Sequence, residues 1–428
     1  MATVHRNPPF RAEHLGSLLR PSELLAKRSA FEKNELGREE LTEIENESVK
    51  KVVELQKECG FRALSDGEYR FVCHVEALMS LNTGVRGANT FYIADVQSFG
   101  ERVIFEELDG MTEIRNPSMD IFRPYVPDIA GFIEKGHKPG QSCLCTGKIK
   151  HTGKSTLIDQ FEYLKTLVPE DRYGDIKLTM IAPPWYHLRY KDGKAFPKEV
   201  YSTDEEYFAD ISKAVSAELD ILYERGLRNV QFDDPNFAYF CSEKMLKGWA
   251  EDKSNTKTPD ELLDAYIKCY NDSIEKHTSK IHFGLHICRG NFMGSRHFSE
   301  GGYDRIATKL FRNLNVATYY LEYDTPRAGS FEPLLHLPAH KNVILGVITS
   351  KFPELEDKEK MKARVMEAAD VVAKGAGQSR EEALKRLGVS PQCGFASHEE
   401  GNLLGWEDMK NKLMLVRSIA DEIWPGEP

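Results

Sequence analysis

The sequence predicts an α/β fold, a (β/α)8 TIM barrel with a large insertion after the second strand. Short apolar runs that end in polar or glycine-containing residues recur along the 428 residues, and helical patterns follow most of them. Strands that alternate with helices are typical of a parallel sheet. Eight such units would complete a barrel. A doubly wound parallel sheet is the alternative architecture for the same alternation.

Eight apolar runs are the expected strands, at residues 14–17, 63–66, 177–182, 229–233, 281–286, 317–322, 343–346 and 389–393. Six helical patterns fall between or after them, at residues 39–59, 205–224, 259–277, 303–314, 358–374 and 406–420. Each of these patterns places apolar residues three or four positions apart, which indicates one face against a core.

The second connection interrupts this alternation. About a hundred residues separate residue 68 from residue 175, far more than one crossover needs. We therefore expect one domain, residues 1–428, with an inserted cap or hairpin region at about 70–175. A hairpin is predicted around residues 143–151.

Composition excludes several classes of partner. The net charge is −10 and no block of Lys or Arg occurs, so binding to nucleic acid or to an anionic membrane surface is not expected. Apolar stretches fall short of the roughly 18 residues that cross a bilayer, and the N-terminal residues show no apolar core of a signal peptide. A cytoplasmic location is therefore expected. The sequence does not predict the oligomeric state.

Two of the eight cysteines stand in an unusual context. Eight are too few for a disulfide scaffold in a chain of this length. Six are interpreted as small buried hydrophobes, namely Cys59, Cys73, Cys143, Cys145, Cys241 and Cys269. Cys288 and Cys393 differ because each lies at the end of an expected strand, where barrel enzymes carry their chemistry.

The strand ends bring together the donor types of a zinc site. His286 and Cys288 are two residues apart and so point to the same face of a strand. Glu322 closes another apolar run, and Cys393 closes the last one. One imidazole, two thiols and one carboxylate suit tetrahedral Zn²⁺ and not Mg²⁺ or Ca²⁺.

This donor set favours activation of a thiol over activation of water. Two thiolates and a carboxylate leave the ion with net negative charge, which makes it a poor generator of hydroxide. An incoming thiol can instead replace the weakest ligand and lose its proton to the field of the metal. Only the thiolate attacks carbon at a useful rate.

The same motifs resemble the catalytic domain of cobalamin-independent methionine synthase and its single-domain relatives. The H-x-C pair, the downstream Glu and the later C-G of that family fall on His286, Cys288, Glu322 and Cys393. Other family motifs match at Gly16-Ser17, at Asp66-Gly67-Glu68 and at Gln231-Phe232-Asp233-Asp234-Pro235. The resemblance extends in order from about residue 11 to residue 424 and is weakest between residues 68 and 175.

The resemblance implies a zinc-dependent transferase that alkylates a thiol inside a (β/α)8 barrel. The four residues above would be its zinc ligands. Ser17, Glu68 and Asp233 would line the pocket of a homocysteine-like thiol, and the two acids would meet its amino group. A capping or turn role is the alternative for Ser17 and Asp233. The partners implied are this small thiol and an alkyl donor.

The chain departs from the family on the side of the methyl donor. Ala182-Pro183-Pro184 stands where the folate-using synthase has T-G-P, and Thr349-Ser350-Lys351 stands where it has D-x-H. That histidine is thought to assist the folate leaving group, which is poor unless protonated. Methionine synthesis from methyltetrahydrofolate and thiol-dependent opening of an epoxide therefore both stay open. For the proton that such a reaction needs, His187, Tyr186 and His297 are candidates.

Two hypotheses lie outside this class. A barrel decarboxylase that resembles the uroporphyrinogen enzyme would need no metal. A non-catalytic relative would bind thiols for regulation or sensing. Bound zinc in the purified protein would distinguish a zinc transferase from the metal-free decarboxylase. Catalytic turnover would distinguish it from the non-catalytic binding protein.

Overall fold

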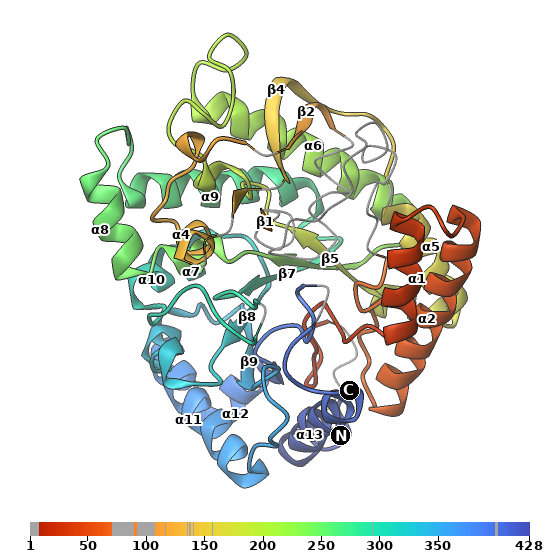
Figure 1. Cartoon of the computed structure of the whole chain (residues 1–428). Coiled ribbons are helices and arrows are strands. Elements are labelled where there is room, and N and C mark those ends of the chain that lie inside the picture. The colour runs from red at the N-terminus through yellow and green to blue at the C-terminus, as the bar shows by residue number, and fades with distance from the viewer. Residues whose placement is uncertain are drawn as a thin grey trace.

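The structure is a computed structural model, and it describes residues 8–70, 90–91, 108–115, 117–134, 136, 138–139, 141–155, 157–292, 294–398 and 401–428. Six parallel strands pair in the order β10-β9-β8-β7-β6-β5. Their bounds are β5 Lys177–Ile181, β6 Asn229–Asp233, β7 His282–Ile287, β8 Thr318–Glu322, β9 Asn342–Ile348 and β10 Leu387–Pro391. Figure 1 shows these strands at the centre of the molecule with helices around them.

The helices that surround the sheet are α1 Ser22–Glu32, α2 Arg38–Glu58, α4 Pro127–Glu134, α5 Leu157–Thr166, α6 Asp204–Glu224, α7 Asn236–Tyr239, α8 Glu243–Glu251, α9 Pro259–Ile274, α10 Asp304–Asn313, α11 Lys358–Ala376, α12 Arg380–Leu384 and α13 Trp406–Ile423. Short 3-10 turns are η3 Met119–Ile121, η4 Glu170–Asp175, η5 His187–Arg189, η6 Glu275–His277, η7 Pro326–Ala328 and η8 Glu332–His336. All six predicted helices are present, and their ends differ from the prediction by at most three residues.

Capping residues explain where several helices begin and end. Thr258 and Glu261 form a capping box at the start of α9, with Pro259 in its first turn. Asp357 caps α11 by accepting a hydrogen bond from Lys360 N. At the other end of α11, Gly377 adopts φ +64°, the left-handed conformation that favours glycine.

Neither of the first two predicted strands forms a full strand: residues 14–17 take part in no strand or bridge, and residues 63–66 contribute one bridge, so short contacts stand at the two edges of the sheet. Ala12 forms a single parallel bridge with Val389 of β10, and Leu64 forms one with Ile176, just before β5. The two segments also meet each other, because Leu18 N donates to Gly67 O at 3.0 Å. The α/β fold of TIM-barrel type is thus confirmed, with a six-stranded sheet that one bridge extends at each edge.

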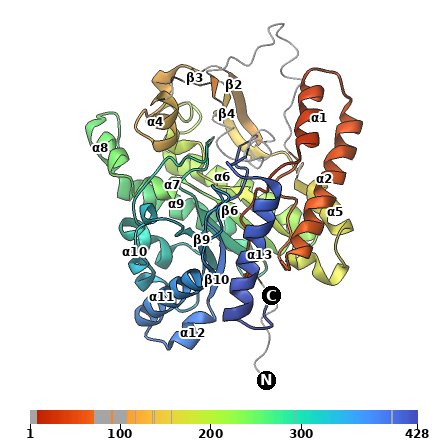
Figure 2. The ribbon, with the colours of Figure 1, turned by 60° about the horizontal axis from the view of Figure 1, so that its bottom comes forward.

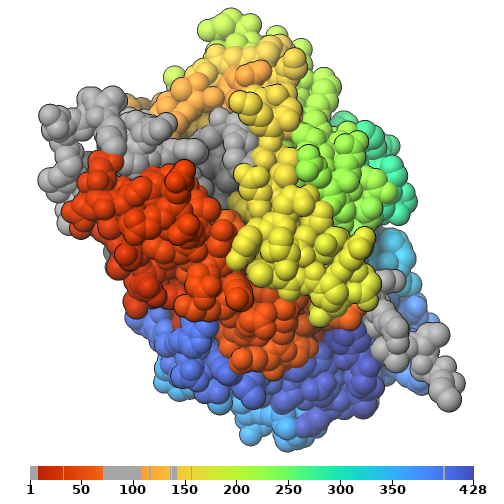
Figure 3. Space-filling model, turned by 90° about the vertical axis from the view of Figure 1, so that its right-hand side faces the viewer, coloured from red at the N-terminus to blue at the C-terminus, as the bar shows by residue number. Residues whose placement is uncertain are grey.

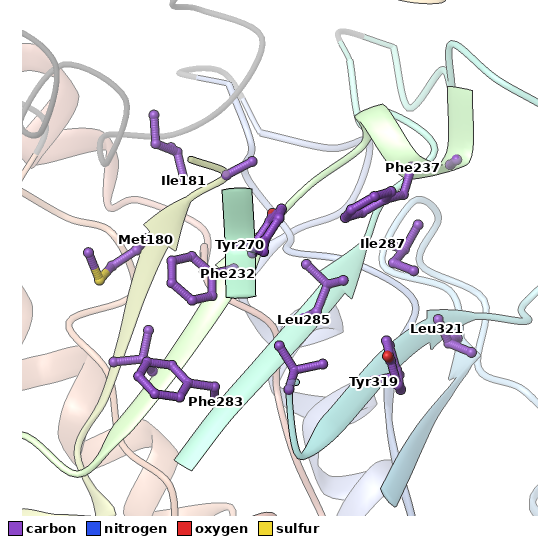
Figure 4. Packing of buried hydrophobic residues seen from close by; sticks show 14 of the residues in the cluster. Met180, Ile181, Phe232, Phe237, Tyr270, Phe283, Leu285, Ile287, Tyr319 and Leu321 are labelled. Carbon is purple, nitrogen blue, oxygen red and sulfur yellow. The ribbon is translucent and has the colours of Figure 1, made fainter. Parts of the chain in front are cut away.

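Alternation of side chains along the strands separates two environments. Residues such as Phe232, Leu285 and Leu321 point outward into the main hydrophobic core, where Tyr270 of α9 packs edge-on against Phe232 with ring centroids 5.4 Å apart. Figure 4 shows this layer of apolar side chains. The residues between them, such as His286 of β7, point to the opposite, inner side of the curved sheet and place polar groups there.

A buried ion pair lies at the start of β5. Lys177 Nζ lies 2.8 Å from Glu13 Oε2, and both side chains are fully buried. A smaller apolar cluster of Leu15, Tyr320 and Ile344 lies apart from the main core. The inner side of the sheet is therefore a packed mixture of charged and apolar side chains and not an open channel.

Outside the sheet, a long ribbon is formed by β2 (Leu108–Arg115) and β4 (Gln141–His151), which pair antiparallel. The predicted hairpin around residues 143–151 is wrong in form, because these residues form one strand whose partner lies earlier in the chain. A second small sheet pairs β1 (Thr90–Phe91) with β3 (Lys138–Pro139). Figure 2 shows the ribbon at the end of the molecule opposite α11 and α12.

The ribbon and the segment that joins it to the sheet are anchored by side-chain contacts. His151 of β4 contacts Glu218 of α6, with 2.7 Å between Nε2 and Oε2. On another face, α5 packs beside α2: Tyr163 donates to Asn46 O at 2.7 Å, and Lys57 donates to Leu167 O at 2.9 Å. Figure 3 shows this face.

The predicted insertion at about 70–175 lies partly outside the described residues, and its boundaries stay a prediction.

Candidate metal centre

Four buried side chains converge where β7, β8 and β10 end. One ligand atom from each of His286, Cys288, Glu322 and Cys393 lies within 4.8 Å of all the others. His286 belongs to β7 and Glu322 to β8, while Cys288 and Cys393 follow β7 and β10 by one and two residues. Among the described residues this is the group of His, Cys, Asp and Glu side chains that could hold a metal ion.

The spacing within the cluster fits a tetrahedral zinc site. His286 Nε2 lies 3.4 Å from Cys393 Sγ, and the sulfur atoms of Cys288 and Cys393 are 3.5 Å apart. Ligand bonds of roughly 2.0–2.3 Å to zinc require separations of roughly 3.3–3.8 Å along the edges of a tetrahedron. The donor set and its geometry therefore suit zinc.

The orientation of His286 leaves one ring nitrogen for a metal. Its Nδ1 lies 3.2 Å from Tyr320 O, a carbonyl that can only accept, so Nδ1 carries the proton and Nε2 faces the cluster. Metal-binding histidines are usually oriented in this way by a backbone carbonyl or a carboxylate.

The cluster holds ionisable groups whose pKa values are shifted by burial and by their neighbours. The hydrogen bond from Cys288 and burial together raise the pKa of the Cys393 thiol well above its usual value. Burial also acts to raise the pKa of Glu322, but Arg327, Arg289, His286 and Lys351 outweigh it and lower the pKa. Two adjacent thiols can both ionise only beside a compensating cation, which is what a divalent metal provides.

Backbone geometry around the cluster requires glycine at two positions. Gly290 adopts φ +95°, and its N–H donates to Cys288 Sγ at 3.1 Å. A Cβ at Gly290 would lie 2.8 Å from Phe298 N, and one at Gly394 would lie 2.1 Å from Ser17 Oγ. The turns that carry both cysteines thus depend on these residues.

Loops after three strands are tied together beside Cys393. The carbonyl of Gly394 accepts from Asn291 Nδ2 at 2.7 Å and from Ser350 Oγ at 2.8 Å. Lys351, almost fully buried, donates to Asn291 Oδ1 at 3.0 Å and to two backbone carbonyls. Thr349-Ser350-Lys351, the segment that replaces D-x-H, therefore holds these loops in place.

Two arginines support Glu322, and the sequence did not indicate this. Arg327 lies 3.3 Å from Glu322 Oε2 and 3.2 Å from Asp324 Oδ1. The backbone N–H of Arg289 donates to Glu322 Oε1 at 3.3 Å, and its guanidinium stacks 4.1 Å from the Tyr303 ring. Both arginines follow strand ends, and both face the buried carboxylate of Glu322.

The three predicted substrate residues lie around the same end of the sheet. Ser17 accepts from Ala396 N at 3.3 Å, close to Gly394. Glu68 is buried against Gly16, where a Cβ would lie 2.2 Å from its Oε1, and it adopts φ +60°, which is strained for a residue other than glycine. Asp233 pairs in register with His286. Burial raises the pKa of Asp233 against the opposing effect of His286.

The proton donors considered from the sequence differ in their surroundings. His187 is buried, with Nδ1 3.0 Å from Tyr266 OH and Nε2 3.1 Å from Asp204 Oδ1, so both ring nitrogens have partners. His297 is one-third exposed and pairs with Glu300. The structure gives neither residue a contact with the metal cluster.

The other cysteines match their interpretation as core residues in most cases. Cys59, Cys143, Cys145 and Cys269 are buried and Cys241 is half-buried, while Cys73 lies outside the described residues.

No helix in the described ranges is long and apolar enough to cross a membrane.

A parallel α/β fold of TIM-barrel type with a buried His, Cys, Glu and Cys cluster at its strand ends defines a barrel-type protein with a candidate metal centre. Sequence comparison identifies the family. Residues 195–422 match the family described as the cobalamin-independent synthase catalytic domain, and the chain belongs to this family. The expected family and the α/β barrel-type fold are therefore confirmed. Family membership supports methyl transfer to a thiol as the class of reaction.

Relatives cover the chain almost completely. The uncharacterized proteins YxjG and YxjH of Bacillus subtilis are 33% and 32% identical to it, over 98% of this chain and 96% of theirs. A methionine synthase of Thermococcus kodakarensis is 22% identical over 46% of each chain.

Solved structures with the same fold also cover nearly the whole chain. A Listeria monocytogenes protein, provisionally assigned as a vitamin-B12-independent methionine synthase, matches with a TM-score of 0.67 and 25% identity over 98% of this chain and 99% of its own. A B12-independent methionine synthase from Shewanella sp. W3-18-1, solved with selenomethionine, matches with a TM-score of 0.59 and 16% identity over 97% of each chain. The second likeness concerns the fold alone.

Proposed function

We propose that this protein is a zinc-dependent transferase that activates a small thiol and transfers a methyl or other alkyl group to its sulfur. The observation that carries the proposal is the convergence of His286, Cys288, Glu322 and Cys393 within 4.8 Å. The separations of Cys393 Sγ from His286 Nε2 and from Cys288 Sγ, 3.4 and 3.5 Å, suit tetrahedral zinc. When bound there, zinc would lower the pKa of a substrate thiol so that the thiolate attacks carbon.

The chain's own residues would position the thiol substrate. Glu68 and Asp233 offer carboxylates after the Leu64 segment and at the end of β6, which lie on either side of β5, and Ser17 offers a hydroxyl beside Gly394. Carboxylates at these positions favour a ligand that carries a cation. The amino group of a homocysteine-like thiol would supply that cation and direct the sulfur toward the cysteine cluster.

Second-sphere contacts would keep the ligand set in place. The Tyr320 carbonyl orients His286, the Gly290 N–H stabilises a thiolate at Cys288, and Arg327 holds Glu322. Such contacts fix the orientation of ligands before metal binds. The burial of all four ligands excludes bulk water, which favours the thiolate as nucleophile.

The donor of the alkyl group is the open part of the proposal. Methyltetrahydrofolate-dependent methionine synthesis and opening of an epoxide are the two candidates. Lys351 and Ser350 hold loops in place where a folate-using relative has D-x-H, which favours a donor that does not need that histidine.

A cytoplasmic location also stays a prediction, which cell fractionation can test.

The decisive experiment combines metal content with a panel of substrates. Purified protein should contain about one zinc per chain. Methyltetrahydrofolates, S-methylated sulfonium compounds and epoxides are each combined with homocysteine, glutathione and small thiols. We expect S-alkylation with at least one pair, loss of it after chelation and recovery with added zinc.

Two results would contradict the proposal in different ways. A protein without zinc that decarboxylates a substrate would belong to a metal-free barrel class. A protein that binds zinc and thiols but alkylates no thiol with any donor would be a binding protein.

A further inference from the structure

Three buried hydrogen-bond donors near the ends of β5 and β6 have no partner among the described residues. They are the hydroxyl of Tyr239, the indole N–H of Trp185 and the amide nitrogen of Asn236. All three side chains are completely buried. Buried polar groups in folded proteins nearly always have a hydrogen-bond partner. Three buried donors without a partner near the same strand ends therefore indicate that a bound molecule supplies the acceptors.

A buried arginine holds these groups in place. The guanidinium of Arg189 stacks 4.0 Å from the Trp185 ring and donates to Asn236 Oδ1 at 3.3 Å. It also pairs with Asp128 of α4 at 2.5 Å, so its charge is compensated. The two donors of Trp185 and Asn236 therefore flank a neutral ion pair. Donors held rigidly before a ligand arrives are the usual form of an electrostatic binding site.

The Tyr239 hydroxyl is close enough to this ion pair and to Cys288 of the metal cluster for their charges to act on it. Tyr239 ends α7, which follows β6 after Asp233 and Asp234, and β6 pairs with the strand that carries His286. The charged groups that act on the hydroxyl are Asp128, Arg189, Cys288 and Asp234. Burial raises the pKa of Tyr239 well above its ordinary value, so the hydroxyl keeps its proton and stays a donor.

We propose that Tyr239 is a catalytic residue, whose hydroxyl donates a hydrogen bond to the oxygen or nitrogen atom of the alkyl donor that leaves during transfer. Trp185 and Asn236 bind further acceptors of the same molecule. In the reaction a sulfur–carbon bond forms while the bond from that carbon to the leaving atom breaks. The leaving atom takes the electron pair, and the proton that the thiol lost balances its charge. This inference rests on the proposed transferase function.

The test compares Tyr239→Phe with Tyr270→Phe. Tyr270 is an equally buried tyrosine, but its hydroxyl has a partner, Asp234 Oδ2 at 2.7 Å. Tyr239→Phe removes a hydroxyl without a partner, so its melting temperature should stay unchanged or rise. Tyr270→Phe breaks a buried hydrogen bond, so its melting temperature should fall. Zinc content should stay the same in both.

Kinetics with the donors that the wild-type protein uses then decide the role of Tyr239. For a donor with an oxygen or nitrogen leaving atom, kcat of Tyr239→Phe should fall about 10²–10³-fold while KM changes little, as for removal of one donor from an oxyanion hole. For a sulfonium donor, whose leaving atom becomes a neutral thioether, kcat should hardly change. Tyr270→Phe should affect both types of donor alike.

Four outcomes overturn the inference. Unchanged kcat in Tyr239→Phe with an oxygen or nitrogen leaving group leaves the transferase function intact but removes the role of Tyr239. A lowered melting temperature together with equal losses for all donors would show that the hydroxyl has a structural partner. A wild-type protein that uses only sulfonium donors has no leaving atom for Tyr239 to bind. Absence of any turnover by the wild-type protein contradicts the proposed function itself, and the inference with it.

Discussion

Nε2 of His286 lies 3.4 Å from Sγ of Cys393, although 107 residues separate them in the chain. The contact joins the end of β7 to the turn after β10, two strands that are not neighbours in the sheet. Because the sheet curves so that these two ends face each other, a ligand set forms from residues far apart in sequence. The contact defines the first prediction.

Replacement of Cys393 by serine should remove most of the bound zinc and the activity while the protein still folds. Neither Cys393 nor Cys288 belongs to the main hydrophobic cluster, so the core stays intact. Zinc content by elemental analysis and far-ultraviolet circular dichroism measure the two effects. Cys241→Ser, outside the cluster, is the matched control and should keep its zinc. Full zinc occupancy in the double variant Cys288→Ala, Cys393→Ala would end the assignment.

Arg327→Gln should weaken zinc binding without removing a ligand. Arg327 lies 3.3 Å from Glu322 Oε2, and loss of such an outer contact typically lowers metal affinity about 10–100-fold. Competition with a chelator measures the affinity. The control is Arg305→Gln, which removes a partly exposed ion pair with Asp260 and should leave zinc binding unchanged. Equal affinities in both variants and the wild type would show that Glu322 needs no such support.

A substrate thiol should bind at the cluster and release a proton. The motivation is the thiolate-rich set of His286, Cys288, Glu322 and Cys393, which suits thiol activation better than water activation. In protein substituted with cobalt, the visible spectrum should change when a thiol that supports turnover is added. An unchanged spectrum with every such thiol would mean that the thiol reacts elsewhere.

Much of the sheet could be predicted because buried parallel strands are short, continuous apolar runs. The run at 229–233 coincides with β6, and the run at 317–322 extends β8 by one residue. The run at 343–346 lies within β9. The run at 14–17, which reads His-Leu-Gly-Ser, is short and polar, and the structure gives its neighbourhood only a single bridge. Apolar pattern thus locates the strong strands, while segments at the edges depend on tertiary contacts.

The candidate site was predictable to the extent that residue type reveals chemistry. His286, Cys288, Glu322 and Cys393 carry metal-binding groups, and each stands where an apolar run ends. Arg327 and Tyr239 carry no such signal, because an arginine in a loop is usually solvated and a tyrosine in the segment Phe237-Ala238-Tyr239-Phe240 is usually core. Only the three-dimensional arrangement shows that one contacts Glu322 and the other has an unpartnered hydroxyl.

Acid sensitivity should depend on His14. Burial, with Lys177 nearby, lowers the pKa of His14 to about 3, against 6.5 for the free side chain. Between pH 6.5 and about 3 the unfolded chain therefore binds more protons than the folded one. This contribution to the free energy of unfolding is complete above pH 6.5 and is lost as the pH falls, by up to about 1.4 kcal/mol per pH unit.

His14→Gln should therefore flatten the dependence of stability on pH below neutrality. Urea unfolding at pH 7 and pH 5 measures the slope. The exposed His340 provides the control, because His340→Gln should leave the wild-type slope unchanged. A slope that is equally steep in His14→Gln and in the wild type would assign acid sensitivity to other groups.

Methyltetrahydrofolate should be a poor donor for this protein even when homocysteine binds. Thr349-Ser350-Lys351 replaces the D-x-H of the folate-using synthase, and the structure engages Ser350 and Lys351 in contacts with Gly394 and Asn291. Burial lowers the pKa of Lys351, but its ammonium already donates to three oxygen atoms. Neither side chain is free to replace the missing imidazole, and the help of a general acid is typically worth about 10²–10⁴-fold in rate.

Steady-state rates with methyltetrahydrofolate, an epoxide and a sulfonium donor, each with homocysteine, measure this preference. We expect the strained or positively charged donors to react faster by a clear margin. Lys351→Met is the matched variant: it should loosen the loops around Asn291 and lower the rate with all donors alike, because Lys351 acts on the loops and not on one leaving group. Efficient formation of methionine from methyltetrahydrofolate would overturn the prediction. The zinc–thiol assignment would stand.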